Sequence, residues 1–408
     1  MSLSAPHVGA ALREASLEAF DQLVLLCLER DAAFLVLAGD IYDGAERGLR
    51  AQLRFRDGLE RLSDAGIPTF VAHGNHDPVE EGWSAVSSWP ELVHVFGAGA
   101  VEAVPVVRGG EQIAIVQGVS YGHRDVTENL ALGYFRQPGP GLQVGVLHCN
   151  VAGAADGYAL YSPCTLSDLR EAGLDYWALG HIHSRMVLSG APDRSDPWVV
   201  YPGDLQARSP KASESGPKGA TVVEVRDGRV RGVEAVACDR IRFSPVTLEI
   251  EGLDGLDDVR AELSELASSE LAKSNGRSLV LHGVLRGRGT VHAELARESV
   301  LEELLQTLRS DCRQVSPFVW WDHLRVETAP VLDLDELRRD EDFAGELVRM
   351  ADELSAGGLD TDEVGDLLGK MPRELDRLAR ELLRHELAWP DLVRAFAVAA
   401  LDLVKVQE

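Results

Sequence analysis

Short apolar runs alternate with longer amphipathic segments along the first 240 residues of the chain. The amphipathic segments at residues 17–29 and 49–64 have the period of helices, and the short apolar runs predict buried strands. We expect these strands at residues 33–38, 69–72, 113–116, 143–147, 176–179 and 198–201. The alternation predicts an α/β layered domain, in which ligands bind in the loops that follow the strands.

The pattern changes near residue 245 and again after Pro330. The middle part predicts a small β-α-β-α-β module with strands at 246–250, 277–285 and 318–326 and helices at 257–272 and 293–309. Beyond Pro330 only helical patterns remain, with breaks at Gly357-Gly358 and Pro372. We therefore expect three domains, at residues 1–240, 241–330 and 331–408. Residues 209–219, rich in Ser, Lys, Gly and Pro, predict a mobile loop.

The composition indicates in which cellular compartment the protein is found. Hydrophobic residues make up 45% of it, but no apolar run reaches the roughly 18 residues of a membrane span, and the N-terminus does not resemble a secretory signal. Five cysteines without a Cys-x-x-Cys pair fit a reducing compartment. We therefore expect a cytoplasmic protein that does not cross a membrane.

The charge balance limits contact with nucleic acid. A net charge of -26 argues against broad, non-specific binding of nucleic acid, which needs a basic surface, but it leaves room for a local groove. Residues 331–408 hold 20 Asp and Glu against 10 Lys and Arg, so this segment is not expected to hold DNA.

Four short polar motifs each follow a predicted strand. They offer carboxylate, amide and imidazole donors, which suit manganese, iron or zinc better than a soft metal. Taken alone, Gly39-Asp40 fits an ordinary turn and His148 fits a core histidine. Their order and their common position at strand ends favour a metal site. The motifs are Gly39–Asp43, Gly74–Asp77, Leu147–His148 and Gly180–His183.

This set of motifs resembles the signature of calcineurin-like metallophosphoesterases. Longer stretches resemble the YhaO branch of the SbcD-type DNA repair exonucleases. The resemblance implies a four-layer α/β/β/α sandwich, a small α+β capping domain and a helical C-terminal tail. The stretches that carry it are Leu37–Gly44, Gly66–Pro68, Gly74–Pro78, Val126–Leu130, Tyr161–Leu169, Asp175–His183 and Gly216–Gly219.

The resemblance also implies roles for individual residues. Asp40 would bridge two divalent metal ions, expected to be Mn²⁺, and His183 would serve one of them. His76 would be the catalytic histidine, held by Asp77, although Asp77 also fits a turn-capping role. Asp43 is expected to be a structural loop residue. The other metal ion would be held by Asn75, His148 and His181.

One motif of the superfamily is missing. Its first strand ends in Asp-x-His, which supplies two ligands to the metal that His183 also holds, and no Asp-x-His precedes Asp40 here. We expect that the start of the chain has been assigned too far downstream; the alternative is a shortened chain. As given, one metal site retains only Asp40 and His183.

The implied function is manganese-dependent hydrolysis of DNA by an exonuclease. A metal-deficient DNA-binding subunit and a small-molecule phosphoesterase remain alternatives. The implied partners are DNA, an SbcC-type SMC-like ATPase that docks on the tail, and a second copy of the chain. Apolar positions at helical spacing from Leu375 to Val404 fit such docking or packing within the tail. Four arginines in the middle part, with two tryptophans nearby, are expected either to contact DNA or to lie on solvated strand edges. They are Arg277, Arg286, Arg288 and Arg325, with Trp320 and Trp321.

Overall fold

The computed structural model describes residues 6–44, 48–81, 83–154, 157–191, 196–211, 214–312 and 316–357. By contacts the chain divides into two compact units. One comprises residues 1–246, 263–283 and 305–324, and the other comprises residues 247–262, 284–304 and 325–408. The predicted helix break at Pro372 and the apolar positions from Leu375 onward lie outside the described residues.

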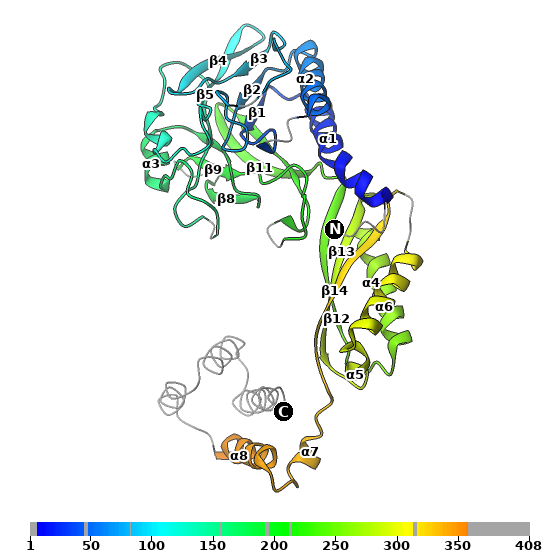
Figure 1. Ribbon diagram of the computed structural model, residues 1–408. Coiled ribbons are helices and arrows are strands. Elements are labelled where there is room, and N and C mark those ends of the chain that lie inside the picture. The colour runs from blue at the N-terminus through cyan, green and yellow to red at the C-terminus, as the bar shows by residue number, and fades with distance from the viewer. Residues whose placement is uncertain are drawn as a thin grey trace. The chain divides into compact units, whose positions relative to one another are not determined.

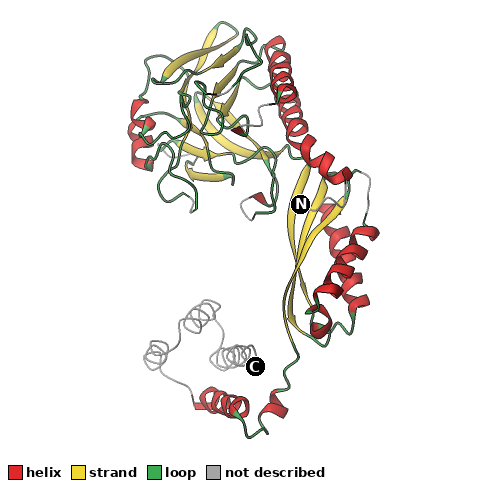
Figure 2. Ribbon diagram, viewed as in Figure 1, coloured by secondary structure: helices red, strands yellow, loops and turns green. Residues whose placement is uncertain are grey.

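Two sheets form the core of the first unit (Figures 1 and 2). The smaller sheet has the order β1-β2-β3 and is parallel, with strands Leu35–Ala38, Thr69–Ala72 and Val93–Val95. The larger sheet has the order β4-β5-β6-β7-β9-β8. Its strands are Glu102–Arg108 (β4), Glu111–Gly118 (β5), Leu142–His148 (β6), Tyr176–Gly180 (β7), Met186–Ser189 (β8) and Trp198–Tyr201 (β9).

Helices cover the outer faces of the two sheets. On one side, α1 (Pro6–Glu29) and α2 (Leu49–Asp64) pack residues such as Val24 and Leu59 against Val71 of β2. On the other side, α3 (Leu166–Glu171) packs Leu169 against Trp177 of β7. A short 3-10 helix, η2 (Leu130–Gly133), lies beside α3. The structure confirms the predicted α/β layered fold.

Apolar side chains from both sheets fill the space between them. Phe70 and Ala72 of β2 pack with Val144, Val146 and the other inward-facing residues of the larger sheet. Strands β5, β6, β7 and β9 run parallel to one another, so their carboxyl ends lie at one edge, and the outer strands β4 and β8 are antiparallel to them. An antiparallel hairpin that the sequence pattern did not predict follows, formed by β10 (Gly219–Arg226) and β11 (Arg229–Ala237).

The predicted β-α-β-α-β module is present, with one added short helix. Its sheet has the order β12-β13-β14, with strands Ile241–Glu249, Ser278–Arg288 and Val319–Ala329. Its helices are α4 (Leu256–Lys273), α5 (His292–Leu295) and α6 (Glu298–Asp311). The chain continues through α7 (Leu334–Leu337) and α8 (Phe343–Gly357).

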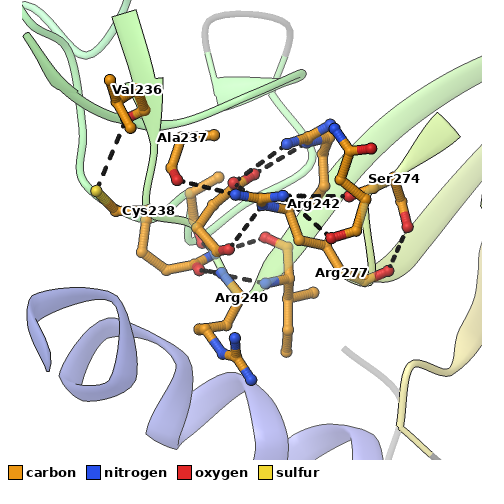
Figure 3. Close-up of polar contacts among 12 residues, drawn as sticks. Val236, Ala237, Cys238, Arg240, Arg242, Ser274 and Arg277 are labelled. Atoms are coloured by element: carbon orange, nitrogen blue, oxygen red, sulfur yellow. Dashed lines mark hydrogen bonds and ion pairs between the residues drawn. The ribbon is translucent and has the colours of Figure 1, made fainter. Parts of the chain in front are cut away.

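A buried carboxylate ties three segments of the first unit together (Figure 3). Asp239 lies between β11 and β12, and its side chain is fully buried. Its carboxylate accepts hydrogen bonds from the side chains of Arg242 and Arg277. Arg277 also donates to the carbonyls of Asp239 and Ala237. Because its side chain is only 17% exposed and all three of its nitrogens donate to acceptors inside the protein, Arg277 is a structural residue, and neither the predicted contact with DNA nor the solvated strand edge applies to it.

The two tryptophans expected to contact DNA are buried as well. Trp321 is fully buried, and Trp320 packs in a cluster with Phe243 and Phe318. Arg286 and Arg325 instead have exposed side chains that pair with Glu327. The expectation that Trp320 and Trp321 contact DNA is therefore wrong, whereas Arg286 on β13 and Arg325 on β14 have solvated side chains.

Arg277→Ala and Arg286→Ala form a matched pair that tests this difference. Arg277→Ala leaves the buried Asp239 with one partner fewer, so the free energy of unfolding is expected to fall by about 3 kcal/mol. Arg286→Ala breaks a solvent-exposed pair and is expected to change stability little. Urea unfolding followed by circular dichroism measures both. Equal midpoints for the two variants would contradict the structural role of Arg277.

Candidate metal centre

The predicted site residues follow the carboxyl ends of four strands. Asp40 follows β1, Asn75 and His76 follow β2, His148 ends β6, and His181 and His183 follow β7. Ligand sites in α/β proteins lie at this edge, and the side chains meet here because the two sheets pack face to face.

Glycines allow these loops to approach one another closely. A Cβ atom on Gly180 would lie 1.7 Å from the carbonyl oxygen of Ala38. A Cβ atom on Gly74 would lie 2.4 Å from Asp40 Oδ1 and 2.7 Å from the His148 ring. Gly74 and Gly180 are therefore required by the convergence of the loops, and any larger residue at either position would separate the donors.

Three electron-pair donors converge at the His148 ring. Its Nδ1 lies 2.9 Å from the carbonyl oxygen of Ala38, which fixes the proton on that nitrogen. The other nitrogen, Nε2, lies 2.9 Å from Asn75 Oδ1 and 3.4 Å from Asp40 Oδ2. With the single ring proton on Nδ1, the Nε2 lone pair repels these oxygens, and either a second ring proton or a bound cation removes the repulsion. This donor set of imidazole, amide and carboxylate fits a divalent metal ion.

His181 completes this group. Its ring centroid lies 5.3 Å from that of His148, and its Nε2 lies 2.9 Å from the carbonyl oxygen of Ala159. Burial and the neighbouring His148 lower the pKa of His181 to about 4. The imidazole is therefore neutral at physiological pH, with its Nδ1 lone pair available to a cation.

His183 lies beside two carboxylates that sequence reasoning missed. Its Nδ1 is 3.6 Å from Asp204 Oδ2 and 3.8 Å from Glu214 Oε1, and the three donor atoms lie within 4.8 Å of one another. The Glu214 carboxylate raises the pKa of His183 against the effect of burial. Burial raises the pKa of Asp204 to about 6. Asp204 follows β9 by three residues and Glu214 lies further along the same segment, but neither belongs to a histidine-bearing motif, so the sequence pattern did not single them out.

Asp77 does not hold His76, which corrects the prediction from the sequence. The Asp77 side chain is fully buried, and its Oδ2 lies 2.9 Å from His73 Nδ1. Its two oxygens also accept hydrogen bonds from the backbone N–H groups of Gly74, Asp40, Ile41 and Tyr42. Asp77 thus caps backbone N–H groups of two loops and ties the loop after β2 to the loop after β1.

Asp43 contacts the His76 ring instead. Asp43 Oδ1 lies 2.7 Å from His76 Nδ1, and the two side chains are 40% and 37% exposed. Burial alone would raise the pKa of Asp43, but the neighbouring Arg208 and His76 outweigh it and lower the pKa. A charged carboxylate at Nδ1 leaves Nε2 of His76 to face a ligand. Asp43 was expected to be a structural loop residue, and its contact with His76 was not predicted from the sequence.

The fold and this donor set define a metallophosphoesterase, and comparison with known proteins agrees. Residues 6–185 match the calcineurin-like phosphoesterase family, and residues 243–329 match the middle domain of the metallophosphoesterase YhaO. The chain is 32% identical to YhaO of Bacillus subtilis (strain 168) over 330 residues, which cover 81% of this chain and 78% of the relative. The chain therefore belongs to the YhaO-type calcineurin-like metallophosphoesterases, as the motifs predicted.

Relatives of lower identity are named as DNA repair proteins. The DNA double-strand break repair protein Mre11 of Thermoplasma acidophilum is 26% identical over 301 residues, 70% of this chain and 73% of the relative. Mre11 of Archaeoglobus fulgidus is 23% identical over 85% of this chain and 81% of the relative.

Among the described helices, none is both long enough and apolar enough to cross a membrane.

Proposed function

We propose that this site hydrolyses phosphodiester bonds in DNA with two divalent cations, manganese being the physiological metal, and that the protein is an exonuclease. The observation that carries the proposal is the convergence of His148 Nε2, Asn75 Oδ1 and Asp40 Oδ2 next to a histidine–carboxylate pair. The relatives named as DNA double-strand break repair proteins support DNA as the substrate.

The metal ligands are assigned from their places at this edge. Asp40, Asn75, His148 and His181 would hold one cation, and Asp40 and His183 would hold the other. When bound, a pair of divalent cations supplies activation of a water molecule and stabilisation of charge on the phosphate. The backbone N–H of His76 donates to Asp40 Oδ1 at 2.9 Å, so the proposed catalytic histidine is fixed to the carboxylate that would be shared by the two cations.

His76 supplies the proton that the leaving group needs. Hydrolysis adds water across the phosphorus–oxygen bond, so phosphorus gains a hydroxyl group and the departing sugar oxygen gains a proton. His76 Nε2 donates this proton while Asp43 stabilises the charged ring through Nδ1. A sugar alkoxide is a poor leaving group, and its departure therefore depends on this acid.

The domain limits and partners follow from the same proposal. We assign residues 1–240 to the phosphoesterase domain, 241–330 to a capping domain that guides DNA, and 331–408 to a segment that docks on an SbcC-type ATPase. The family matches over residues 6–185 and 243–329 support the first two limits. Copurification of such an ATPase with the full chain, and its loss on deletion of 331–408, tests the docking segment.

Replacement of His148 by alanine tests the metal centre. This change removes the nitrogen at which the three donors converge, so manganese bound per chain is expected to fall by at least one ion, and hydrolysis of DNA is expected to be lost. Mass spectrometry of the purified protein measures the metal, and digestion of a linear duplex with added Mn²⁺ measures activity. The control is His94→Ala, because His94 pairs with Glu102 elsewhere in the domain.

Other outcomes would redirect the proposal. Unchanged manganese content in His148→Ala would contradict the ligand assignment. Binding of duplex ends without cleavage would favour a DNA-binding subunit. Hydrolysis of bis-p-nitrophenyl phosphate without any cleavage of DNA would favour a small-molecule phosphoesterase.

A further inference from the structure

Arg208 reaches the candidate centre from a part of the chain far from the four motifs. It lies after β9, and its Nη1 is 2.5 Å from Asp43 Oδ2. The other oxygen of the same carboxylate, Oδ1, contacts His76 Nδ1 at 2.7 Å. The two oxygens of Asp43 are thus divided between a guanidinium and an imidazole, and the three side chains form a chain of contacts that ends at the catalytic histidine.

This contact contributes little to the stability of the fold. The side chains of Arg208 and Asp43 are 55% and 40% exposed, and ion pairs with this exposure stabilise proteins only weakly. Its consequence is geometric. A carboxylate with one oxygen held by Arg208 cannot rotate freely, so its other oxygen stays directed at His76.

The backbone of Arg208 is itself fixed by a buried carboxylate. Glu214, which is 7% exposed, accepts hydrogen bonds from the backbone N–H of Arg208 at 2.6 Å and of Ser209 at 2.9 Å. It also accepts one from the hydroxyl group of Ser209. Glu214 Oε1 faces His183 Nδ1. The segment that carries Arg208 is therefore anchored beside a residue of the proposed metal centre.

We propose that Arg208 is a positioning residue for hydrolysis, which acts by holding Asp43 and, through it, the His76 ring. This inference rests on the proposed function of His76 as the proton donor. Without Arg208, the Asp43 carboxylate turns, the imidazole loses its fixed orientation, and Nε2 no longer points steadily at the leaving oxygen.

Arg208→Gln tests the inference with two substrates. DNA has a poor leaving group, whereas bis-p-nitrophenyl phosphate releases a stable anion that needs no proton. Arg208→Gln is expected to lower kcat on DNA by about ten- to a hundredfold with little change in KM, since small misplacements of catalytic groups have effects of this size. Little change is expected for bis-p-nitrophenyl phosphate.

The double variant Arg208→Gln/His76→Ala separates positioning from direct action. If Arg208 acts through His76, the double variant is expected to match His76→Ala alone. A further loss in the double variant would show that Arg208 acts independently, and a raised KM with both substrates at unchanged kcat would show that it binds phosphate. Either result would overturn the inference. The matched control is Arg226→Gln, because Arg226 is an exposed arginine that pairs with Glu224.

A spectroscopic measurement tests the same geometry without activity. The ring N–H proton of His76, assigned by its loss in His76→Ala, is expected to exchange slowly with water in the wild-type protein and faster in Arg208→Gln. Equal exchange in the two proteins would overturn the inference. If the wild-type protein cleaves neither substrate, the proposed function fails, and this measurement still decides the role of Arg208.

Discussion

His76→Ala is expected to lower kcat on DNA by about 10²- to 10⁴-fold, the usual contribution of a positioned general acid. The loss should be much smaller on bis-p-nitrophenyl phosphate, because p-nitrophenolate leaves without a proton. His94→Ala is a close control, since His94 Nε2 lies 3.0 Å from Glu102 Oε2 and these side chains are 35% and 41% exposed. Steady-state kinetics on the two substrates measures the effect.

Asp43→Asn should also lower kcat on DNA, because an amide does not stabilise a charged imidazole as a carboxylate does. Equal losses on both substrates in His76→Ala would show that His76 does not protonate the leaving group. Full activity on DNA in His76→Ala would remove it from the mechanism altogether.

Asp77→Ala is expected to have the largest effect on stability. The change leaves four backbone N–H groups and His73 without their shared acceptor in a buried position. Each buried donor left without a partner costs about 1–3 kcal/mol, and partial access of water reduces the sum, so we expect the free energy of unfolding to fall by about 3–5 kcal/mol. Urea unfolding measures the loss.

Asp168→Ala is the matched control for Asp77→Ala. Asp168 also accepts backbone and side-chain hydrogen bonds, but it does so at the surface, in the capping box of α3. Its replacement is expected to cost about 1 kcal/mol. Because Asp77 ties together the loops that carry Asp40 and Asn75, Asp77→Ala should also lower the manganese content, while Asp168→Ala should not. The same stability and metal content in both variants would contradict the assigned role of Asp77.

The sequence was sufficient to predict the α/β layers and the strand ends at which the candidate metal ligands lie. Apolar runs such as 69–72 are buried on both faces, so they stand out from their surroundings, and each glycine-bearing loop begins where a run ends. The contact predicted for Asp77 was wrong. Its position next to His76 predicted that the two side chains interact, but the turn after β2 directs Asp77 into the protein and leaves His76 at the surface.

The sequence pattern could not predict contacts between segments that are far apart in the chain. Arg208 and Asp43 are neighbours only because the segment after β9 returns to the edge formed by β1 and β2. Glu214 lies within residues 209–219, whose composition predicted a mobile loop, yet its carboxylate fixes Arg208 and lies beside His183. Arg277 was expected to contact DNA or to lie on a solvated strand edge, and the contact with the buried Asp239 shows that it does neither.

Metal content measured together with DNA cleavage tests the central claim most directly. Wild-type protein and His148→Ala would be loaded with Mn²⁺, freed of excess metal, analysed for bound manganese and assayed on a linear DNA duplex. The proposed centre predicts bound manganese and cleavage in the wild-type protein, with both reduced in His148→Ala. Wild-type protein that binds no manganese, or that cleaves DNA equally well after His148→Ala, would contradict it.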